Sequence, residues 1–261
     1  MAEYIETLDS MLDTAYEFVA NEDLGQAWFI LKRLQAEYPE VAEVWALMGD
    51  IWMIDGDLEY ALEFYDRAVE LDELWPHWHT ARAICLVELG QIAEAEVDVE
   101  RALDLDPEHS EAYWVKATIH EAKLEFDPAD VAYSIAANMD PDLFNKPIRL
   151  GAPQFDRLVK RAIRQLPPAV LKRLDSLDVK IYKMPDPDEA GSLWRPLVPV
   201  TCNVKEESGP YSVEIHIYQK NIERFCKTTK DVLWEIQEAV LGELLRHFHW
   251  DLKMQSEVEF E

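Results

Sequence analysis

The stretches WALMGDIW at residues 45–52 and ALEFYDRAVEL at residues 61–71 decide the fold, because their pattern returns every 34 residues. The small residue that opens the second stretch, Ala61, recurs as Ala27, Ala95 and Ala129. The small residue of the first stretch, Gly49, has its counterparts at Ala15, Ala83 and Ala117. Four copies in one register, without an insertion, predict a stack of similar units.

Further positions keep the same register. A branched or aromatic residue stands at Leu31, Tyr65, Val99 and Tyr133. A second small position holds Ala68, Ala102 and Ala136, with Leu34 in the first copy. Proline closes three copies at Pro39, Pro107 and Pro141, with Glu73 in the remaining one. Small residues let two antiparallel helices approach closely and proline ends a helix, so each copy is predicted to be a helical pair.

This pattern resembles the tetratricopeptide repeat family, with repeats at about residues 8–41, 42–75, 76–109 and 110–143. The resemblance implies an α-solenoid over residues 1–143 that binds peptides or helices of partner proteins on its concave face. That face is formed by the first helix of each copy. By register it presents Asp9, Asp13, Tyr16, Glu43, Asp50, Met53, His77, Thr80, Ile84, Glu88, Trp114, Thr118 and Glu121. Acids interleaved with apolar residues favour a basic or amphipathic partner segment, with Trp114 as the best single anchor.

One class of ligand is not expected. Chaperone-type tetratricopeptide domains clamp a C-terminal carboxylate with a set of Lys and Asn side chains. Here the matching positions hold Leu12, Tyr16, Leu47, His77 and Ala81. An alternative is that the groove holds the protein's own C-terminal half.

The balance of acidic and basic residues changes near residue 145, close to the end of the last repeat. Residues 1–145 contain 34 Asp and Glu against 7 Lys and Arg, whereas residues 146–261 contain 18 of each. This break favours two domains, of which the acidic one should repel nucleic acid and anionic membranes and attract basic partners. Acidity can also serve solubility alone. We see no signal peptide, no long apolar run and only three cysteines without CxxC spacing, which favours a cytoplasmic protein.

The second half changes pattern after a Pro- and Gly-punctuated linker at residues 144–153. We predict a helix from Gln154, a strand in DVKIYKM, a possible strand at 197–204, an alternating strand at 211–218 and a long final helix. In the alternating strand, Val213, Ile215 and Ile217 face one way. The final helix has Thr228 or Thr229 as its N-cap.

This order, with NIER at residues 221–224 and EAVLGELLRHFHW at 238–250, resembles the small bacterial zincin-like metallopeptidase family over about residues 153–255. The resemblance implies a small α+β domain at residues 154–261, whose last helix should carry H-E-x-x-H. Gly242 stands at the first ligand histidine, Glu243 at the general base and Arg246 at the second ligand histidine.

The departures from that motif concern zinc directly. A catalytic zinc needs about three protein ligands, but glycine offers no ligand atom and arginine does not lose its proton. We therefore expect no catalytic residue, no metal and no cofactor, with Arg246 paired to Glu243. The alternative is a zinc-dependent metallopeptidase with non-standard ligands, whose repeats recruit substrate. Its ligands would be Glu243, His247, His249 and Asp251, with His216 as another possible third ligand.

Two smaller expectations concern the same half. Cys226 stands near Lys227, Lys230 and a helix start, an environment that can lower a thiol pKa, although a half-buried cysteine without function is the commoner case. The strand at 211–218 is expected at an edge of the sheet, where it could accept an extended peptide.

Together the residues predict a mainly α protein: a four-repeat solenoid followed by a small, degenerate zincin-like α+β domain. Its expected function is that of a protein-binding adaptor or scaffold rather than an enzyme. The expected partner is another protein, and neither nucleic acid nor a membrane.

Overall fold

The computed structural model describes residues 7–187, 194–205 and 211–247. The chain divides into two compact units, Met1–Pro141 and Asp142–Glu261. Each unit has a hydrophobic core of its own.

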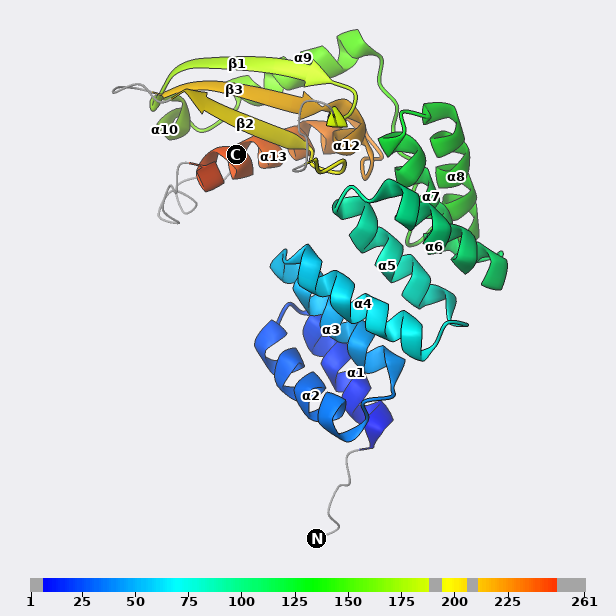
Figure 1. Cartoon of the computed structure of the whole chain (residues 1–261). Helices are drawn as coiled ribbons and strands as arrows, with labels where there is room; N and C mark the ends of the chain where they lie inside the picture. The colour runs from blue at the N-terminus through cyan, green and yellow to red at the C-terminus, as the bar shows by residue number, and fades with distance from the viewer. Residues whose placement is uncertain (1–6, 188–193, 206–210, 248–261) are drawn as a thin grey trace. The chain divides into compact units, whose positions relative to one another are not determined.

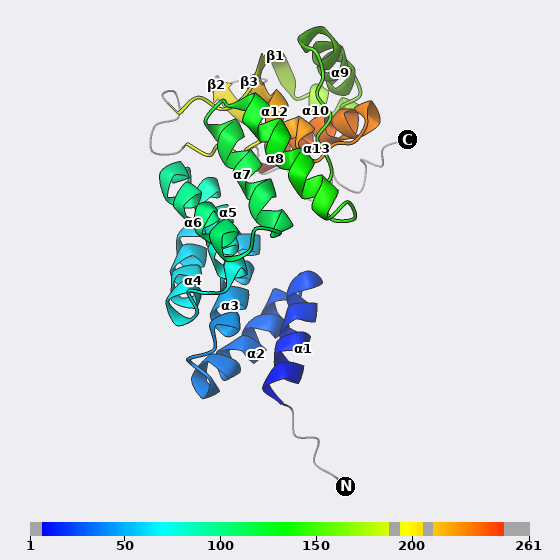
Figure 2. The same cartoon turned by 90° about the vertical axis from the view of Figure 1, so that its right-hand side faces the viewer.

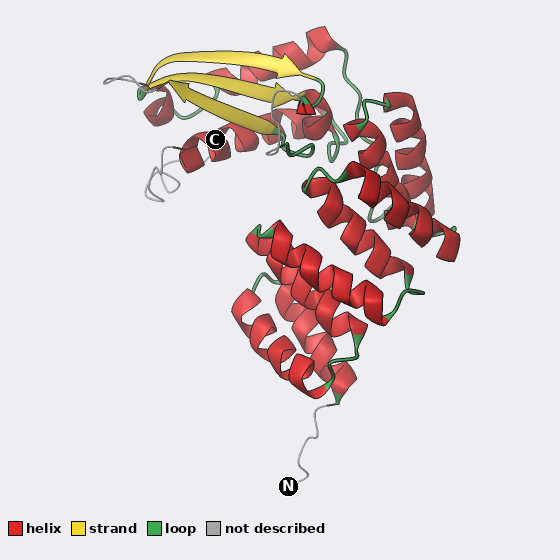
Figure 3. Cartoon of the chain, viewed as in Figure 1, coloured by secondary structure: helices red, strands yellow, loops and turns green. Residues whose placement is uncertain are grey.

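The described part of the N-terminal unit consists of helices joined in antiparallel pairs (Figures 1 and 3). The pairs are α1 (Leu8–Ala20) with α2 (Leu24–Glu37), α3 (Ala42–Asp55) with α4 (Leu58–Leu71), α5 (Pro76–Glu88) with α6 (Ile92–Leu105), and α7 (Ser110–Ala122) with α8 (Phe126–Met139). Contacts also run from α1 to α3, from α3 to α5 and from α5 to α7. The first helices of the pairs therefore form a continuous layer, as expected of a helical solenoid.

The small residues of the sequence period lie where the helices of a pair cross. Ala27, Ala61, Ala95 and Ala129 are all completely buried. Gly49 shows why size matters, because a Cβ atom added there would lie 2.7 Å from the ring of Tyr65. The periodic alanines and glycine thus set how closely the two helices of each pair approach.

The turn inside each pair contains one residue with positive φ, and these residues are also 34 positions apart. Glycine occupies the position in the second and third pairs, as Gly56 (φ +88°) and Gly90 (φ +75°). In the first and fourth pairs it is held by Glu22 (φ +58°) and Leu124 (φ +60°). A left-handed conformation costs a residue with a Cβ atom roughly 1–2 kcal/mol. The packing of the pairs therefore imposes the turn even where the local residue disfavours it.

The C-terminal unit combines helices with a three-stranded sheet. Its elements are α9 (Ala152–Arg164), α10 (Pro168–Leu171), β1 (Leu174–Tyr182), β2 (Val200–Lys205), β3 (Tyr211–Tyr218), α12 (Gln219–Glu223) and α13 (Thr229–His247). The strand order is β1-β3-β2, with β1 parallel and β2 antiparallel to β3. Val213, Ile215 and Ile217 are buried on one face of β3, as predicted, and belong to one core with apolar residues of α9 and α13. Figure 2 shows the sheet and these two helices in the C-terminal unit.

The expectation that residues 211–218 form an edge strand was wrong. β3 lies between β1 and β2, so both of its backbone edges are already paired. Alternation of apolar and polar residues reports which face of a strand is buried but not its place in the sheet. An extended peptide therefore cannot add to this strand.

Side chains of α12 form hydrogen bonds with backbone atoms of two loops in the C-terminal unit. Gln219 donates to the carbonyl of Leu150 at 2.8 Å, and the Glu223 carboxylate accepts from the backbone N–H of Leu150 at 3.0 Å. Asn221 donates to the carbonyls of Pro196 and Val198. These three side chains are buried. The NIER motif therefore has a structural role, because its polar groups satisfy backbone atoms that would otherwise be buried without partners.

The residues just before and at the start of α13 test two predictions, the N-cap of the helix and the pKa of Cys226. The backbone N–H of Asp231 donates to the Thr228 hydroxyl at 3.2 Å, and the Asp231 carboxylate accepts from the backbone N–H of Thr228 at 2.8 Å. Thr228 is therefore the N-cap, in a reciprocal capping arrangement. The suggestion of a lowered pKa for Cys226 was wrong, because burial raises the pKa of this thiol to about 12.

Candidate functional site

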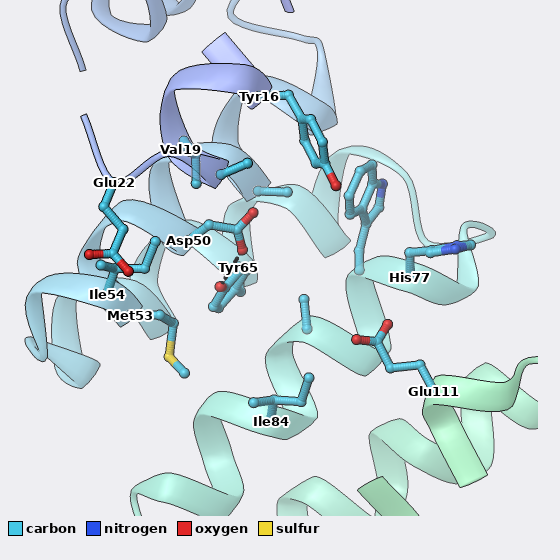
Figure 4. Close-up of a pocket in the computed structure, with 14 residues that line it drawn as sticks. Tyr16, Val19, Glu22, Asp50, Met53, Ile54, Tyr65, His77, Ile84 and Glu111 are labelled. Atoms are coloured by element: carbon cyan, nitrogen blue, oxygen red, sulfur yellow. Dashed lines mark hydrogen bonds between the residues drawn. The ribbon is translucent and has the colours of Figure 1, made fainter. Parts of the chain in front are cut away.

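A cavity of about 640 Å³ opens within the N-terminal unit among α1, α3, α5 and α7 (Figure 4). The residues around it share a mixed character of apolar, aromatic and acidic side chains. They are Tyr16, Val19, Ala20, Glu22, Ala46, Asp50, Met53, Ile54, Tyr65, His77, Trp78, Ala81, Ile84 and Glu111. A concave, mainly apolar site with a few polar groups is typical of a binding pocket.

Five residues assigned to the groove from sequence do line this cavity. They are Tyr16 of α1, Asp50 and Met53 of α3, and His77 and Ile84 of α5. The structure brings them together because the first helices of successive pairs lie side by side.

Other predicted groove residues lie elsewhere. Glu121 has no exposed surface, and the hydroxyl of Tyr133 donates to its carboxylate at 2.8 Å, so placing Glu121 on the groove surface was wrong. Trp114 packs against Tyr133 with ring centroids 4.6 Å apart and does not line the cavity. Asp13 and Glu88 do not line it either.

The remaining predicted positions have identifiable partners. Thr80 and Thr118 are buried, and their hydroxyls donate to backbone carbonyls within their own helices, at Pro76 and Val115. Glu43 lies close to Asp9 and Asp13, and its pKa is raised by burial and by these two carboxylates. These acids form a separate group outside the cavity lining.

The polar residues Tyr65, Glu111 and Glu22 of the cavity were missed from the sequence. Tyr65 belongs to the second helix of its pair, but its ring passes over Gly49 and its hydroxyl donates to Asp50 at 2.7 Å. Glu111 comes from the first turn of α7. The exceptional glycine in a position that otherwise holds alanine was the available signal for Tyr65.

Acidic side chains prevail in the lining of the cavity. Burial raises the pKa of Asp50, while the hydrogen bond from Tyr65 acts in the opposite direction. Burial also raises the pKa of Glu111, and repulsion from Asp50 adds to it. Figure 4 shows both side chains at the cavity. With Glu22 as a third carboxyl and no Lys or Arg among the described lining residues, the cavity is complementary to positive charge.

The end of α13 carries Gly242, Glu243 and Arg246, the residues compared with a zinc-binding motif from the sequence. Arg246 donates to the Glu243 carboxylate at 2.5 Å, which confirms the predicted pair. An added Cβ atom at Gly242 would meet nothing within 4 Å. In the C-terminal unit, Cys202 of β2 has a pKa raised to about 11 by burial and by the nearby Glu243. A carboxylate held by a guanidinium, next to a glycine, does not fit a zinc ion.

The alternative ligand set cannot be placed in full. His249, Asp251 and the His247 side chain lie outside the described residues. His216 lies 2.7 Å from the Glu214 carboxylate. Within the described residues, no three His, Cys, Asp or Glu side chains are grouped so that they could hold a metal ion. The described helices also include none that is long and apolar enough to cross a membrane.

Comparisons with known proteins concern mainly the helical pairs. The tetratricopeptide repeat family model matches residues 12–76 and 80–129. Serine/threonine-protein phosphatase T of Aspergillus oryzae is 28% identical over 101 residues, which is 39% of this chain and 21% of that protein. Hsp70-Hsp90 organizing protein 3 of Arabidopsis thaliana is 27% identical over 140 residues, which is 52% of this chain and 25% of that protein.

Among solved structures, a thermophilic tetratricopeptide protein of Thermus thermophilus is similar at a TM-score of 0.49 and 19% identity. The match covers 54% of this chain and 78% of that one. The chain spans about a quarter or less of the length of the two curated relatives. The N-terminal region of this chain carries tetratricopeptide repeats.

Proposed function

We propose that the tetratricopeptide repeats act as a protein-binding adaptor or scaffold and that the cavity holds a basic, amphipathic segment of a partner protein. One observation carries the proposal: Asp50 and Glu111 lie in an apolar-walled cavity that no Lys or Arg of the described residues lines. The name of the Arabidopsis relative, an organizing protein, supports an adaptor function.

The lining suggests how such a segment would bind. A Lys or Arg side chain of the partner would lie near Asp50 and Glu111, whose carboxylates stabilise positive charge most effectively when partly withdrawn from water. The neighbouring apolar side chain of the partner would contact Met53, Ile54 and Ile84. Ile54 is 46% exposed and Tyr16 is 64% exposed, so an occupant would remove apolar surface from water.

Charge argues against the segments outside the described residues as the occupant. The segments outside the described residues, 1–6, 188–193, 206–210 and 248–261, each contain more acidic than basic residues. None of them offers the net positive charge that the cavity would attract.

Selection from a displayed library of random peptides on the full chain tests the proposal. We expect enrichment of peptides in which Lys or Arg stands beside Leu, Ile, Met or Phe. The double variant D50N/E111Q keeps the shapes of both side chains and removes their charge, so the selected peptides should bind it at least about tenfold more weakly.

The matched control is E63Q/D104N, which removes the same charge from two exposed positions outside the cavity. Its affinity for the selected peptides should stay within about twofold of the wild type, because exposed charges outside a site contribute little. Selection of peptides without a basic residue, or an equal loss in both double variants, would contradict the proposal.

We also propose that the C-terminal unit is a zincin-like domain that has lost its zinc site. The order of its elements and the position of Glu243 on the last helix support this interpretation, and the open space beside Gly242 leaves room for the missing ligand. The G242H/R246H variant would restore two histidines at i and i+4 around Glu243. We expect it to bind one zinc ion more tightly than an ordinary pair of helical histidines does.

The control is D156H/K160H, an i, i+4 pair on the exposed side of α9. Equal zinc affinity of the two variants would contradict the zincin-like interpretation. Elemental analysis of the wild type addresses the competing enzyme hypothesis, because stoichiometric zinc that is lost on E243A would favour a metallopeptidase.

A further inference from the structure

The first helix of the C-terminal unit carries positive charge in a chain whose formal net charge is −27. Residues 144–173 contain eight Lys and Arg and one acid, Asp156. Four of the cations belong to α9 and are exposed: Arg157, Lys160, Arg161 and Arg164. Residues three, four and seven positions apart share one face of a helix, so these four form a stripe about 10 Å long. We call it the α9 stripe.

The opposite face of α9 packs into the hydrophobic core and so fixes the orientation of the helix. Phe155, Val159 and Ala162 are buried in the core of the C-terminal unit. Because these residues anchor the helix, it cannot rotate about its axis, and the basic side chains point toward solvent.

Only one of the four cations of the α9 stripe pairs with an acidic side chain among the described residues. Lys160 pairs with Asp156 at 2.8 Å, whereas Arg157, Arg161 and Arg164 form no ion pair with any described residue. Arg161 and Arg164 lie in the last turn, where positive charge stabilises the helix end. That effect fades within one turn, so it does not account for Arg157 in the middle of the helix.

We infer that the α9 stripe binds an acidic segment of another protein. Guanidinium groups match carboxylates in paired hydrogen bonds, and three of the four cations are arginines. A short acidic segment would place its charge on the stripe alone. A nucleic acid or an anionic bilayer would bring extended negative charge, which the rest of this acidic chain repels. The stripe also contains no aromatic side chain on which a base could stack.

Fluorescence anisotropy of a labelled oligoglutamate peptide with the full chain tests this inference, which is independent of the cavity. We expect saturable binding at low ionic strength that weakens with added salt. The triple variant R157E/R161E/R164E should bind at least about tenfold more weakly, because each exposed pair contributes a modest amount and all three are reversed. Circular dichroism checks that the variant keeps its helical content.

The matched control, K32E/R33E/R67E, changes the net charge equally at exposed positions of the N-terminal unit. It should bind the peptide within about twofold of the wild type once salt screens the long-range field. Equal losses in the two variants would show that net charge alone is measured and would overturn the inference. Tighter binding of an oligothymidylate of equal charge would also overturn it, in favour of a phosphate-bearing partner.

Discussion

The second and fourth repeats place a tyrosine at the same position of the period, Tyr65 and Tyr133, yet they use it differently. Each hydroxyl donates to a carboxyl of the first helix of its pair, Asp50 at 2.7 Å and Glu121 at 2.8 Å. The first pair faces the cavity. The second pair, Tyr133 with Glu121, is buried, and Glu121 has no exposed surface.

One pair of equivalent residues differs in size between the two repeats. Ala46 of the second repeat lines the cavity, and Trp114 stands 68 residues later, at the same position of the fourth repeat. Trp114 packs on Tyr133 and on alanines of α7 and α8. A small residue therefore leaves the space open in one repeat, and a large one fills it in the other. The period specifies the backbone, while side-chain size decides whether a repeat has a site.

The largest expected effect comes from removing that filling residue. Trp114→Ala should lower the free energy of unfolding by about 3 kcal/mol, because the indole packs against a buried cluster. Urea denaturation measures the loss. Tyr16→Ala is the matched truncation at the open cavity, where the ring is 64% exposed, and it should cost less than about 0.5 kcal/mol. Similar losses for both would contradict the contrast between sealed and open repeats.

The two tyrosines can be compared by removing only their hydroxyls. Tyr133→Phe takes a donor from a fully buried carboxyl and should cost about 2 kcal/mol, whereas Tyr65→Phe should cost about 1 kcal/mol because water can reach Asp50 through the cavity. Thermal unfolding of both variants, under identical conditions, checks the order. A larger loss for Tyr65→Phe would reverse our account of the two sites.

The turns of the same two repeats offer an exchange of residues. Gly56→Leu should destabilise the protein by about 1 kcal/mol, because the position has φ +88°. Leu124→Gly should stabilise it by less than that, since the added freedom of glycine in the unfolded chain offsets part of the relieved strain. Denaturation midpoints measure both. Destabilisation by Leu124→Gly would show that the leucine side chain, which is 59% exposed, contributes more than its strain costs.

The smallest expected effect is on the pH dependence. The pKa of Asp50 is raised in the folded protein, so folding binds a proton and the stability falls as pH rises from the usual aspartate range through the raised value. Asp50→Asn should remove this part of the slope and raise the stability at neutral pH by about 0.5 kcal/mol. Unfolding measured between pH 4 and pH 7 checks it, with Asp104→Asn as an exposed control. An unchanged slope would contradict the raised pKa.

The sequence anticipated those features that depend on spacing. The alanines at Ala27 and Ala61 lie at helix crossings, and the burial of Val213 and Ile215 follows from their alternation. The pairing of Arg246 with Glu243 follows from their separation by three residues on one helix. Spacing reports relations within an element or between identical units, which is why these predictions were correct.

The features that failed depend on neighbours from other elements. Glu121 has the register of a groove residue, but Tyr133 of the following helix binds it inside the core. The strand at 211–218 alternates as an exposed edge strand would, but β1 and β2 occupy both of its sides. The basic residues of α9 are present in the sequence, but only the structure shows which face of the helix is exposed, because Phe155 and Val159 bury the opposite face.

By itself, the sequence determined the four-fold helical period, the division of charge between the halves and the pairing of Arg246 with Glu243, because each is a property of residue identity and spacing. The tertiary structure alone decided which repeat keeps a cavity, which carboxyl faces it and where β3 lies in its sheet. Those outcomes depend on how much space side chains from different helices and strands leave to one another, and that space exists only once the elements have packed.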